Sequence, residues 1–200
     1  MLVVADGSTD QMLPPVSRSA LWRQYINALN NRVNRSREGA VRHGRLSADG
    51  EVLLYSGADL PVPIGEGGRL IEALEGGSDV EITSRRLAES EIRIRAPWWS
   101  DLASGLFGGV VRGTALPGIR DAMCGFAFFR RAAASDIFQR QRIERFCFDV
   151  EPLRIARRLS YRIVEVPTAW GNHPVSKFRP VADSLQTLVD VGQSRYYDGA

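Results

Sequence analysis

The chain has 200 residues, of which 44% are hydrophobic, and this length suits one domain with a full core rather than two. Its formal net charge of +3 at pH 7 is only mildly basic, which argues against a nucleic-acid-binding module. The two cysteines, Cys124 and Cys147, form no Cys-x-x-Cys pair, which excludes a zinc site of the usual spacing.

In the first 60 residues, short apolar runs alternate with segments of helical periodicity. The predicted elements are, in chain order, a strand at 2–5, a polar turn at 6–10, a helix at 16–30, an irregular stretch at 31–38, a helix at 38–48 and a strand at 51–56. Seven arginines lie between Arg18 and Arg45 against one glutamate, a patch typical of a solvated face and also suited to phosphates or an anionic membrane.

The same alternation continues to the end of the chain. The predicted elements are a helix at 66–75, a strand at 80–83, a loop at 84–86, a polar loop at 87–96, a helix at 97–112, a strand at 125–129, a short helix at 131–138, a helix at 148–159, a strand at 161–166 and a helix at 181–195. This order predicts an α/β fold with a largely parallel sheet, in one domain over residues 1–200.

The apolar runs give no sign of a membrane span. The longest, residues 102–111, is interrupted by Ser and Gly and is too short to cross a bilayer. Met1 leads directly into a strand-like Leu-Val-Val segment, and no signal peptide is visible. We therefore expect a cytoplasmic protein that can lie at the cytoplasmic face of a membrane without crossing it.

Ligands of open α/β sheets bind beyond the carboxyl ends of the strands. Asp6, Asp59, Arg85 and Asp121 each follow a predicted strand or lead into one, so we expect all four at one edge of the sheet. Carboxylates beside fixed cations match a metal-bridged pyrophosphate, because the metal shares phosphate oxygens while the arginines take the remaining charge. The spacing therefore predicts a site for a phosphorylated ligand.

Each acid also has a structural explanation. Asp6 and Asp10 can form turns through bonds to their own backbone, and Asp59 can cap the turn before Leu-Pro. Asp149, with Glu151 in the first turn of the next predicted helix, is explained by capping and the helix dipole. From spacing alone, these explanations stand beside the functional ones.

Taken together, several segments resemble family 2 glycosyltransferases, and within them the dolichyl-phosphate glucosyltransferase and polyprenyl-phosphate glycosyltransferase group. The resemblance covers nearly the whole chain. Its strongest parts are Val3-Val-Ala-Asp-Gly-Ser-Thr-Asp10, Gly57-Ala-Asp-Leu60, Ile119-Arg-Asp-Ala-Met-Cys-Gly-Phe126, Phe148-Asp-Val-Glu151 and Ile163-Val-Glu-Val-Pro167, followed by Trp170, Asn172, Ser176 and Lys177.

The resemblance implies an A-type glycosyltransferase fold, a UDP- or GDP-sugar donor, a Mg²⁺ or Mn²⁺ ion, and a polyprenyl-phosphate acceptor at a membrane surface. It implies that a hexose moves from the donor to the acceptor with inversion. The roles it implies are nucleotide-sugar binding by Asp6, Ser8, Arg37 and Asp59, metal binding by Asp59, catalysis by Arg85, Asp121 and Lys177, and acceptor-phosphate binding by Ser176, Lys177 and Arg179.

Three departures from the family pattern bear on activity. The Asp-x-Asp motif reads Gly57-Ala58-Asp59, and a Gly-Lys-Gly segment reads Ser36-Arg37-Glu38. The chain also starts at what the resemblance makes the second strand, so we expect the first strand to be missing from the sheet. These departures leave open a catalytically impaired nucleotide-sugar-binding paralogue or fragment, and we expect poor activity of the 200-residue chain alone.

Overall fold

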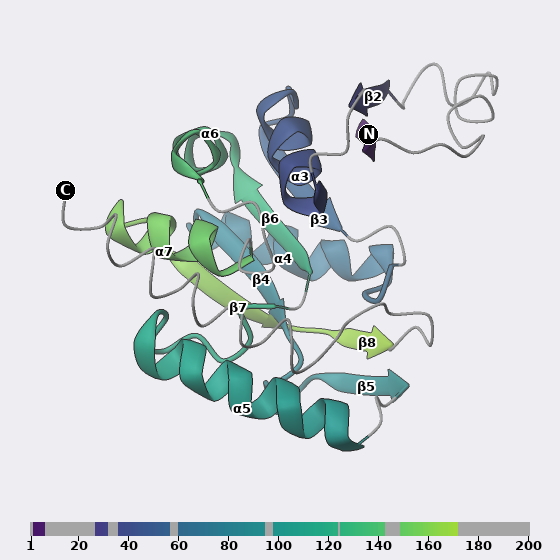
Figure 1. Cartoon of the computed structure of the whole chain (residues 1–200), viewed down its shortest axis with the longest axis vertical. Coiled ribbons are helices and arrows are strands. Elements are labelled where there is room, and N and C mark those ends of the chain that lie inside the picture. The colour runs from purple at the N-terminus through teal and green to yellow at the C-terminus, as the bar shows by residue number, and fades with distance from the viewer. Residues whose placement is uncertain are drawn as a thin grey trace.

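The computed structural model describes residues 2–6, 27–31, 36–56, 60–94, 98–123, 125–142 and 149–171. Its centre is a four-stranded sheet (Figure 1) in the order β3 (Val52–Ser56), β6 (Phe126–Arg130), β4 (Val80–Ser84) and β7 (Ile163–Pro167). Strand β6 runs antiparallel to both β3 and β4, whereas β4 and β7 are parallel. Three of the four strands therefore point the same way, and the predicted α/β class with a largely parallel sheet is confirmed.

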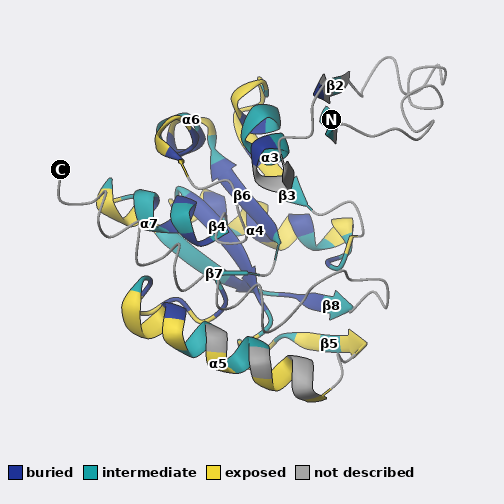
Figure 2. Ribbon diagram, viewed as in Figure 1, coloured by how far each residue is buried: buried dark blue, intermediate teal, exposed yellow. Residues whose placement is uncertain are grey.

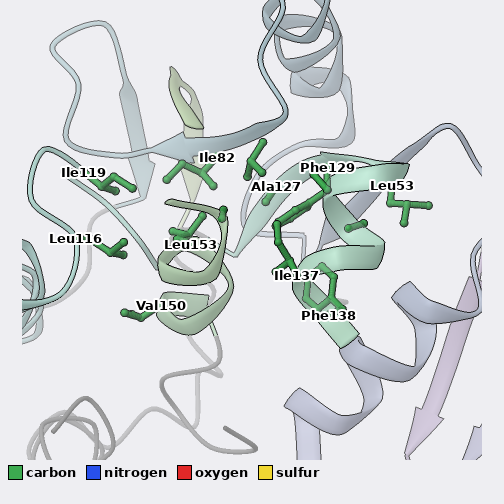
Figure 3. Close-up of a cluster of buried hydrophobic side chains, with 14 of the residues drawn as sticks. Leu53, Ile82, Leu116, Ile119, Ala127, Phe129, Ile137, Phe138, Val150 and Leu153 are labelled. Atoms are coloured by element: carbon green, nitrogen blue, oxygen red, sulfur yellow. The ribbon is translucent and has the colours of Figure 1, made fainter. Parts of the chain in front are cut away.

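Both faces of this sheet are covered, as the unbroken apolar run of β6 requires. On one face, α6 (Arg131–Arg140) and α7 (Val150–Arg158) bring Ile137, Phe138 and Leu153 against Ile82 and Phe129 (Figure 3). On the other face, α4 (Gly67–Glu75) packs its leucines against the alternate side chains of β6. The two-residue period of a strand thus divides the Phe-Ala-Phe-Phe sequence between two cores.

Two smaller sheets flank the centre. Strands β1 (Leu2–Asp6) and β2 (Asn27–Asn31) form a parallel pair beside α3 (Ser36–Leu46), and β5 (Glu91–Ile94) pairs in parallel with β8 (Ala169–Gly171). The helix α5 (Trp98–Thr114) lies along the β5–β8 side of the molecule, and a short 3₁₀ helix, η1 (Ile64–Glu66), leads into α4. None of the described helices has both the length and the apolar character that a bilayer crossing requires.

Three strands were wrongly predicted or not predicted. The end of the helix expected at 16–30 is strand β2, because its backbone pairs with β1 and its Asn31 amide bonds Asp6, contacts that override a helical spacing. The polar loop expected at 87–96 contains β5, whose Glu-Ile-Arg-Ile alternation is that of a strand. Strand β8 was not predicted at all. The helix expected at 181–195 lies outside the described residues.

Candidate active site

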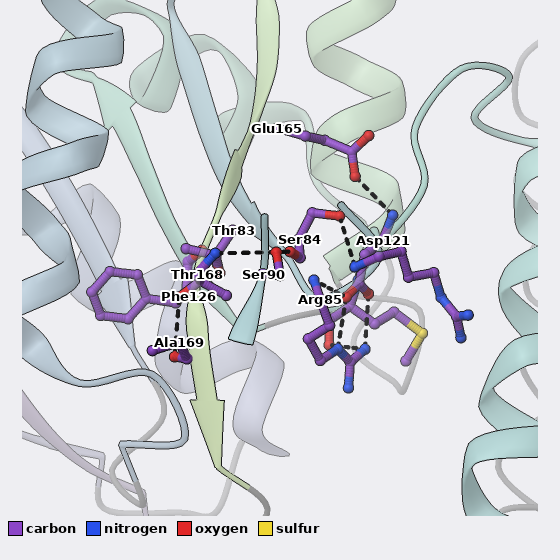
Figure 4. A network of polar contacts seen from close by, with 11 residues as sticks. Thr83, Ser84, Arg85, Ser90, Asp121, Phe126, Glu165, Thr168 and Ala169 are labelled. Atoms are coloured by element: carbon purple, nitrogen blue, oxygen red, sulfur yellow. Dashed lines mark hydrogen bonds and ion pairs between the residues drawn. The ribbon is translucent and has the colours of Figure 1, made fainter. Parts of the chain in front are cut away.

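Arg85 and Asp121 form a bidentate ion pair at the centre of the candidate site (Figure 4). The Arg85 guanidinium donates from Nε to Asp121 Oδ2 at 2.6 Å and from Nη2 to Oδ1 at 2.8 Å. The Arg85 backbone N–H donates to the same Oδ2 at 3.0 Å. Two parallel bonds of this kind fix the plane of a guanidinium as well as its position.

Two segments that are far apart in the sequence contribute the residues of this ion pair. Arg85 is the first residue after β4, and Asp121 lies in the turn between α5 and β6. That turn is anchored by the buried side chains of Leu116 and Ile119. Glu165 of β7 then accepts the backbone N–H groups of Arg120 and Asp121, each at 2.9 Å. The Glu165 carboxylate therefore fixes the position of this turn relative to β7.

The ion pair keeps Asp121 ionised. Burial raises the pKa of the Asp121 carboxyl, but the Arg85 guanidinium and the backbone N–H groups of Arg85 and Met123 outweigh burial, so the pKa lies below its usual range. The Asp121 side chain is only 3% exposed, whereas that of Arg85 is 25% exposed. A ligand that approaches from solvent would therefore meet the cation rather than the carboxylate.

An aromatic ring and a hydroxyl bridge border the pair. The Arg85 guanidinium lies over the Trp170 ring of β8, 5.2 Å from its centroid, within the range of a cation–π contact. Ser90 Oγ donates to the Ser84 carbonyl and accepts the Thr168 N–H at 3.2 Å (Figure 4). These two bonds connect the end of β4 to the beginnings of β5 and β8. Trp170 is part of the family resemblance, but its place beside a cation could not be read from spacing.

Asp6 belongs to a different cluster. Asn31 Nδ2 donates to Asp6 Oδ1 at 2.8 Å, and the Asn31 amide oxygen lies 2.7 Å from His43 Nδ1 of α3. Since the Asn31 amide donates to the carboxylate, its oxygen accepts the Nδ1 proton of His43. Asp6 ends β1, which belongs to a sheet separate from that of β4. The single edge expected for Asp6 and Arg85 is thus divided between two sheets, and Asn31 and His43 were not predicted.

The capping role expected for Asp149 is wrong. Asp149 precedes α7 with helical backbone angles and makes no capping bond with its side chain. It lines a cavity of about 30 Å³ beside the buried Arg45, whose guanidinium lies 4.1 Å from the Phe129 ring centroid and 4.8 Å from that of Phe138. Burial lowers the pKa of Arg45 to about 9, and the charges of Tyr55 and Asp149 oppose this shift. The Asp149 carboxylate therefore interacts electrostatically with the buried Arg45 and does not cap α7.

The remaining predicted site residues cannot be placed. Ser8, Asp59, Ser176, Lys177 and Arg179 lie outside the described residues, and Arg37 is known only as a backbone position in α3. Among the described residues, no group of three or more His, Cys, Asp or Glu side chains could hold a metal ion. The metal-binding role expected of Asp59 therefore stays a prediction.

Sequence comparison gives the chain a family and relatives. The profile of Glycosyl transferase family 2 matches residues 1–138. A relative from Trichomonas vaginalis, dolichyl-phosphate beta-glucosyltransferase ALG5C, is 30% identical over 98% of this chain and 60% of its own length. The dolichyl-phosphate beta-glucosyltransferase of Mus musculus is 34% identical over the whole chain and 65% of its own length. The chain thus spans about 60% of the length of these curated relatives.

Solved structures share the fold at low identity. Glucosyl-3-phosphoglycerate synthase from Mycobacterium tuberculosis, in complex with phosphoglyceric acid, superposes with a TM-score of 0.61 at 16% identity, over 97% of this chain and 67% of its own. Mannosyltransferase PcManGT from Pyrobaculum calidifontis, in complex with GDP-Man and Mn²⁺, superposes with a TM-score of 0.58 at 17% identity, over 100% of this chain and 55% of its own. The A-type glycosyltransferase fold expected from the sequence is confirmed.

Proposed function

The chain belongs to glycosyl transferase family 2, and from this premise we propose that it moves a hexose from a nucleotide sugar to a polyprenyl phosphate with inversion. The donor would be of the UDP-glucose or GDP-mannose type. Glucose and dolichyl phosphate are favoured, because the relatives are named dolichyl-phosphate beta-glucosyltransferases. The reaction would take place at the cytoplasmic face of a membrane, where this chain would bind peripherally.

The observation that carries the proposal is the oriented cation at the end of β4. Arg85 is held in one plane by Asp121 and by the ring of Trp170, and a quarter of its side chain remains exposed. A guanidinium fixed before the ligand arrives stabilises a developing phosphate charge without reorganising during the reaction. We assign Arg85 to the diphosphate of the donor, as the family resemblance implies.

The acceptor chemistry suits a site without a strong base. A phosphate monoester has a second pKa of about 6, so it is mostly ionised near neutral pH and needs positioning more than deprotonation. Asp121 has both oxygens committed to Arg85 and a lowered pKa, which makes it a poor proton acceptor. We therefore assign Asp121 to positioning Arg85, and Ser176, Lys177 and Arg179 to the acceptor phosphate.

A divalent cation, Mg²⁺ or Mn²⁺, is part of the proposal. Asp59 would hold it, and Asp6, Ser8 and Arg37 would contact the nucleotide portion of the donor. When bound, the ion would neutralise charge on the leaving nucleoside diphosphate. The fold neighbour from Pyrobaculum calidifontis, in complex with GDP-Man and Mn²⁺, supports a metal of this kind.

The test is transfer of labelled glucose from UDP-glucose to dolichyl phosphate, with Mn²⁺ or with chelator. We expect metal-dependent transfer that the Arg85→Ala variant loses. GDP-mannose in place of UDP-glucose measures the preference for the donor. Failure of the intact chain to bind either donor by calorimetry, with and without Mn²⁺, would rule out the proposal.

Gly57 favours one second candidate, a nucleotide-sugar-binding paralogue with impaired catalysis. It stands where the family's Asp-x-Asp motif has its first carboxylate. Metal-dependent donor binding without transfer to any polyprenyl phosphate would identify this alternative. The Gly57→Asp variant, which restores the motif, should then recover transfer if the missing carboxylate is the cause.

A further inference from the structure

The outer face of α5 carries an apolar stripe. Trp98, Leu102, Leu106 and Val110 follow one another at four-residue spacing, so they lie on one side of the helix. Their exposed fractions are 77%, 56%, 66% and 39%. The stripe is about 18 Å long at 1.5 Å per residue. Figure 2 shows α5 on the outside of the molecule with an exposed face turned away from the sheets.

The other side of α5 is packed. Val111 is buried in the main core, and the Arg86 guanidinium runs along Gly105 and Gly108, with nitrogen atoms 3.8 and 3.9 Å from where their Cβ atoms would be. The helix therefore has one side that the fold uses and one apolar side exposed to solvent. A contiguous apolar surface of this kind marks an interaction site more often than chance.

The charged residues in α5 and next to it are mainly positive. Asp101 is the one acidic residue in the sequence of α5, whereas the exposed Arg86 lies beside the helix and the exposed Arg112 lies in its last turn. The exposed Arg120 follows in the next turn of the chain. An apolar face with a tryptophan and flanking arginines matches the interfacial zone of an anionic bilayer.

The packed side of α5 borders the candidate site. Residues 115–120 connect the end of α5 to Asp121, and Arg86 is the direct neighbour of Arg85. A surface that α5 touches would therefore lie next to the cation of the site. A lipid-borne phosphate in that surface would reach Arg85 past the end of α5 and Arg86.

We propose that the stripe of α5 lies in the surface of an anionic phospholipid bilayer, with the helix axis parallel to the membrane plane. The proposal rests on the proposed function, because it supplies the route by which a polyprenyl phosphate reaches the site. A second copy of the chain fits less well. Symmetric pairing would bring the arginines of two copies together, and four side chains fall far short of the roughly 20 residues a side of a stable interface.

The test is sedimentation of the intact chain with vesicles of phosphatidylcholine, with and without phosphatidylglycerol. We expect binding that requires the anionic lipid and weakens with salt. The double variant Leu102→Ser/Leu106→Ser should reduce the partition coefficient by about tenfold or more. Arg112→Gln should reduce it by about fivefold, and only on anionic vesicles.

A matched control is available on η1 and α4. Ile64 and Ile71 are 60% and 49% exposed, so Ile64→Ser/Ile71→Ser removes similar apolar surface away from α5. This control should bind vesicles like the unaltered chain. Equal loss in both double variants would overturn the proposal, as would sedimentation that is the same with and without the stripe. If Leu102→Ser/Leu106→Ser instead dissociates a dimer in ultracentrifugation and leaves vesicle binding unchanged, the stripe is a contact between copies and the membrane proposal is wrong.

Transfer to a short, water-soluble prenyl phosphate separates this inference from the proposed function. The stripe variant should keep that transfer and lose transfer to dolichyl phosphate in vesicles. If the unaltered chain glycosylates neither acceptor yet binds vesicles through the stripe, the proposed function fails and the docking surface stands. If the chain glycosylates both acceptors and the stripe variant does so equally, the docking surface fails.

Discussion

At the scale of single residues, the geometry of the Arg85–Asp121 pair separates a positioning acid from a proton acceptor. Both carboxylate oxygens accept from Arg85, and the pKa of Asp121 lies below its usual range. A base in the reaction would leave its own titration in the pH profile of kcat. An acid that only orients Arg85 would not, because it is already ionised wherever the enzyme works.

We therefore expect Asp121→Asn to lower kcat by about tenfold to a hundredfold without changing the shape of its pH profile. Arg85→Lys should cost as much or more, because an ammonium cannot reproduce two parallel bonds to one carboxylate. Steady-state kinetics over a range of pH measures both. Loss of an acidic limb of the profile in Asp121→Asn would contradict the assignment and make Asp121 the base.

Glu81 is a second buried carboxyl, on β4 and away from Arg85. Its side chain is fully buried and Ser78 Oγ donates to its Oε1, while its Oε2 has no hydrogen-bond partner in the described structure. Burial raises the pKa of Glu81 from 4.5 to about 7, against the opposing effects of Ser78 and Arg130. The folded chain therefore binds this proton more tightly than the unfolded chain does.

The free energy of unfolding should accordingly fall as the pH rises from about 4.5 to about 7, because over this range the unfolded chain releases the Glu81 proton while the folded chain retains it. Glu81→Gln should remove this slope and stabilise the chain above neutral pH by up to about 3 kcal/mol, at about 1.4 kcal/mol per pKa unit. Urea unfolding at a series of pH values measures it. The exposed Glu75→Gln is the control, and a slope unchanged in Glu81→Gln would refute the explanation.

At the scale of elements, α3 connects β1 to the central part of the described structure. It packs against β1 on one side and α6 on the other. A Cβ added at Gly44 of α3 would lie 2.9 Å from Val4 Cγ2, closer than two carbon atoms can approach. Because residue 44 has no side chain, α3 can pack closely against β1.

The same substitution at two helical glycines should have opposite effects. Gly44→Ala should destabilise the chain by about 1–2 kcal/mol, because the clash with Val4 outweighs the gain in helix propensity. Gly109→Ala of α5, where nothing lies within 4 Å of the added Cβ, should stabilise by about 0.5–1 kcal/mol. Chemical unfolding of both variants provides the comparison, and a shift in the same direction for both would show that the α3–β1 contact is looser than described.

The apolar strands could be predicted from the sequence, whereas the polar strand β2 and the three-residue strand β8 could not. Strands β3, β4, β6 and β7 are rich in aliphatic and aromatic residues, so their local pattern is sufficient. Strands β2 and β8 depend on a partner distant in the chain, and their own residues favour no single state. The role expected for Asp149 failed for the same reason, because a buried arginine of α3 lies opposite it.

For the candidate site, the sequence predicted the residues but not their contacts. The sequence predicted both Arg85 and Asp121 because each lies close to the end of a recognisable strand, and their roles stay predictions. That they bond each other at a sequence separation of 36 is a product of sheet order, which spacing does not encode. Glu165 and Trp170 lie in segments that the family resemblance marked, yet what they contact is a property of the folded chain alone.

At the scale of the whole molecule, the strand pairs β1–β2 and β5–β8 are less deeply buried than the central sheet. Strands β4 and β6 are buried on nearly every residue, whereas β5 is mostly exposed and β1 is half-buried. Local openings should therefore be much easier at the flanking pairs than in the centre.

Native-state hydrogen exchange should show this order directly. We expect amides of β1, β2 and β5 to exchange at least about a hundredfold faster than those of β4 and β6, which should open only with global unfolding. Gly44→Ala should speed exchange in β1 and β2 further and leave β4 unaffected. Uniform protection across all of these strands would mean that the chain unfolds as one cooperative unit.

Strand β6 has one further consequence, for synthesis on the ribosome. Val52 pairs with Arg130 and Val80 with Phe129, so the partner of both β3 and β4 is made long after them. Until residues 126–130 have left the exit tunnel, the nascent chain carries two apolar strands without the neighbour that separates them. Chaperone engagement during translation should therefore begin soon after Ser84 emerges and end shortly after Arg130 does.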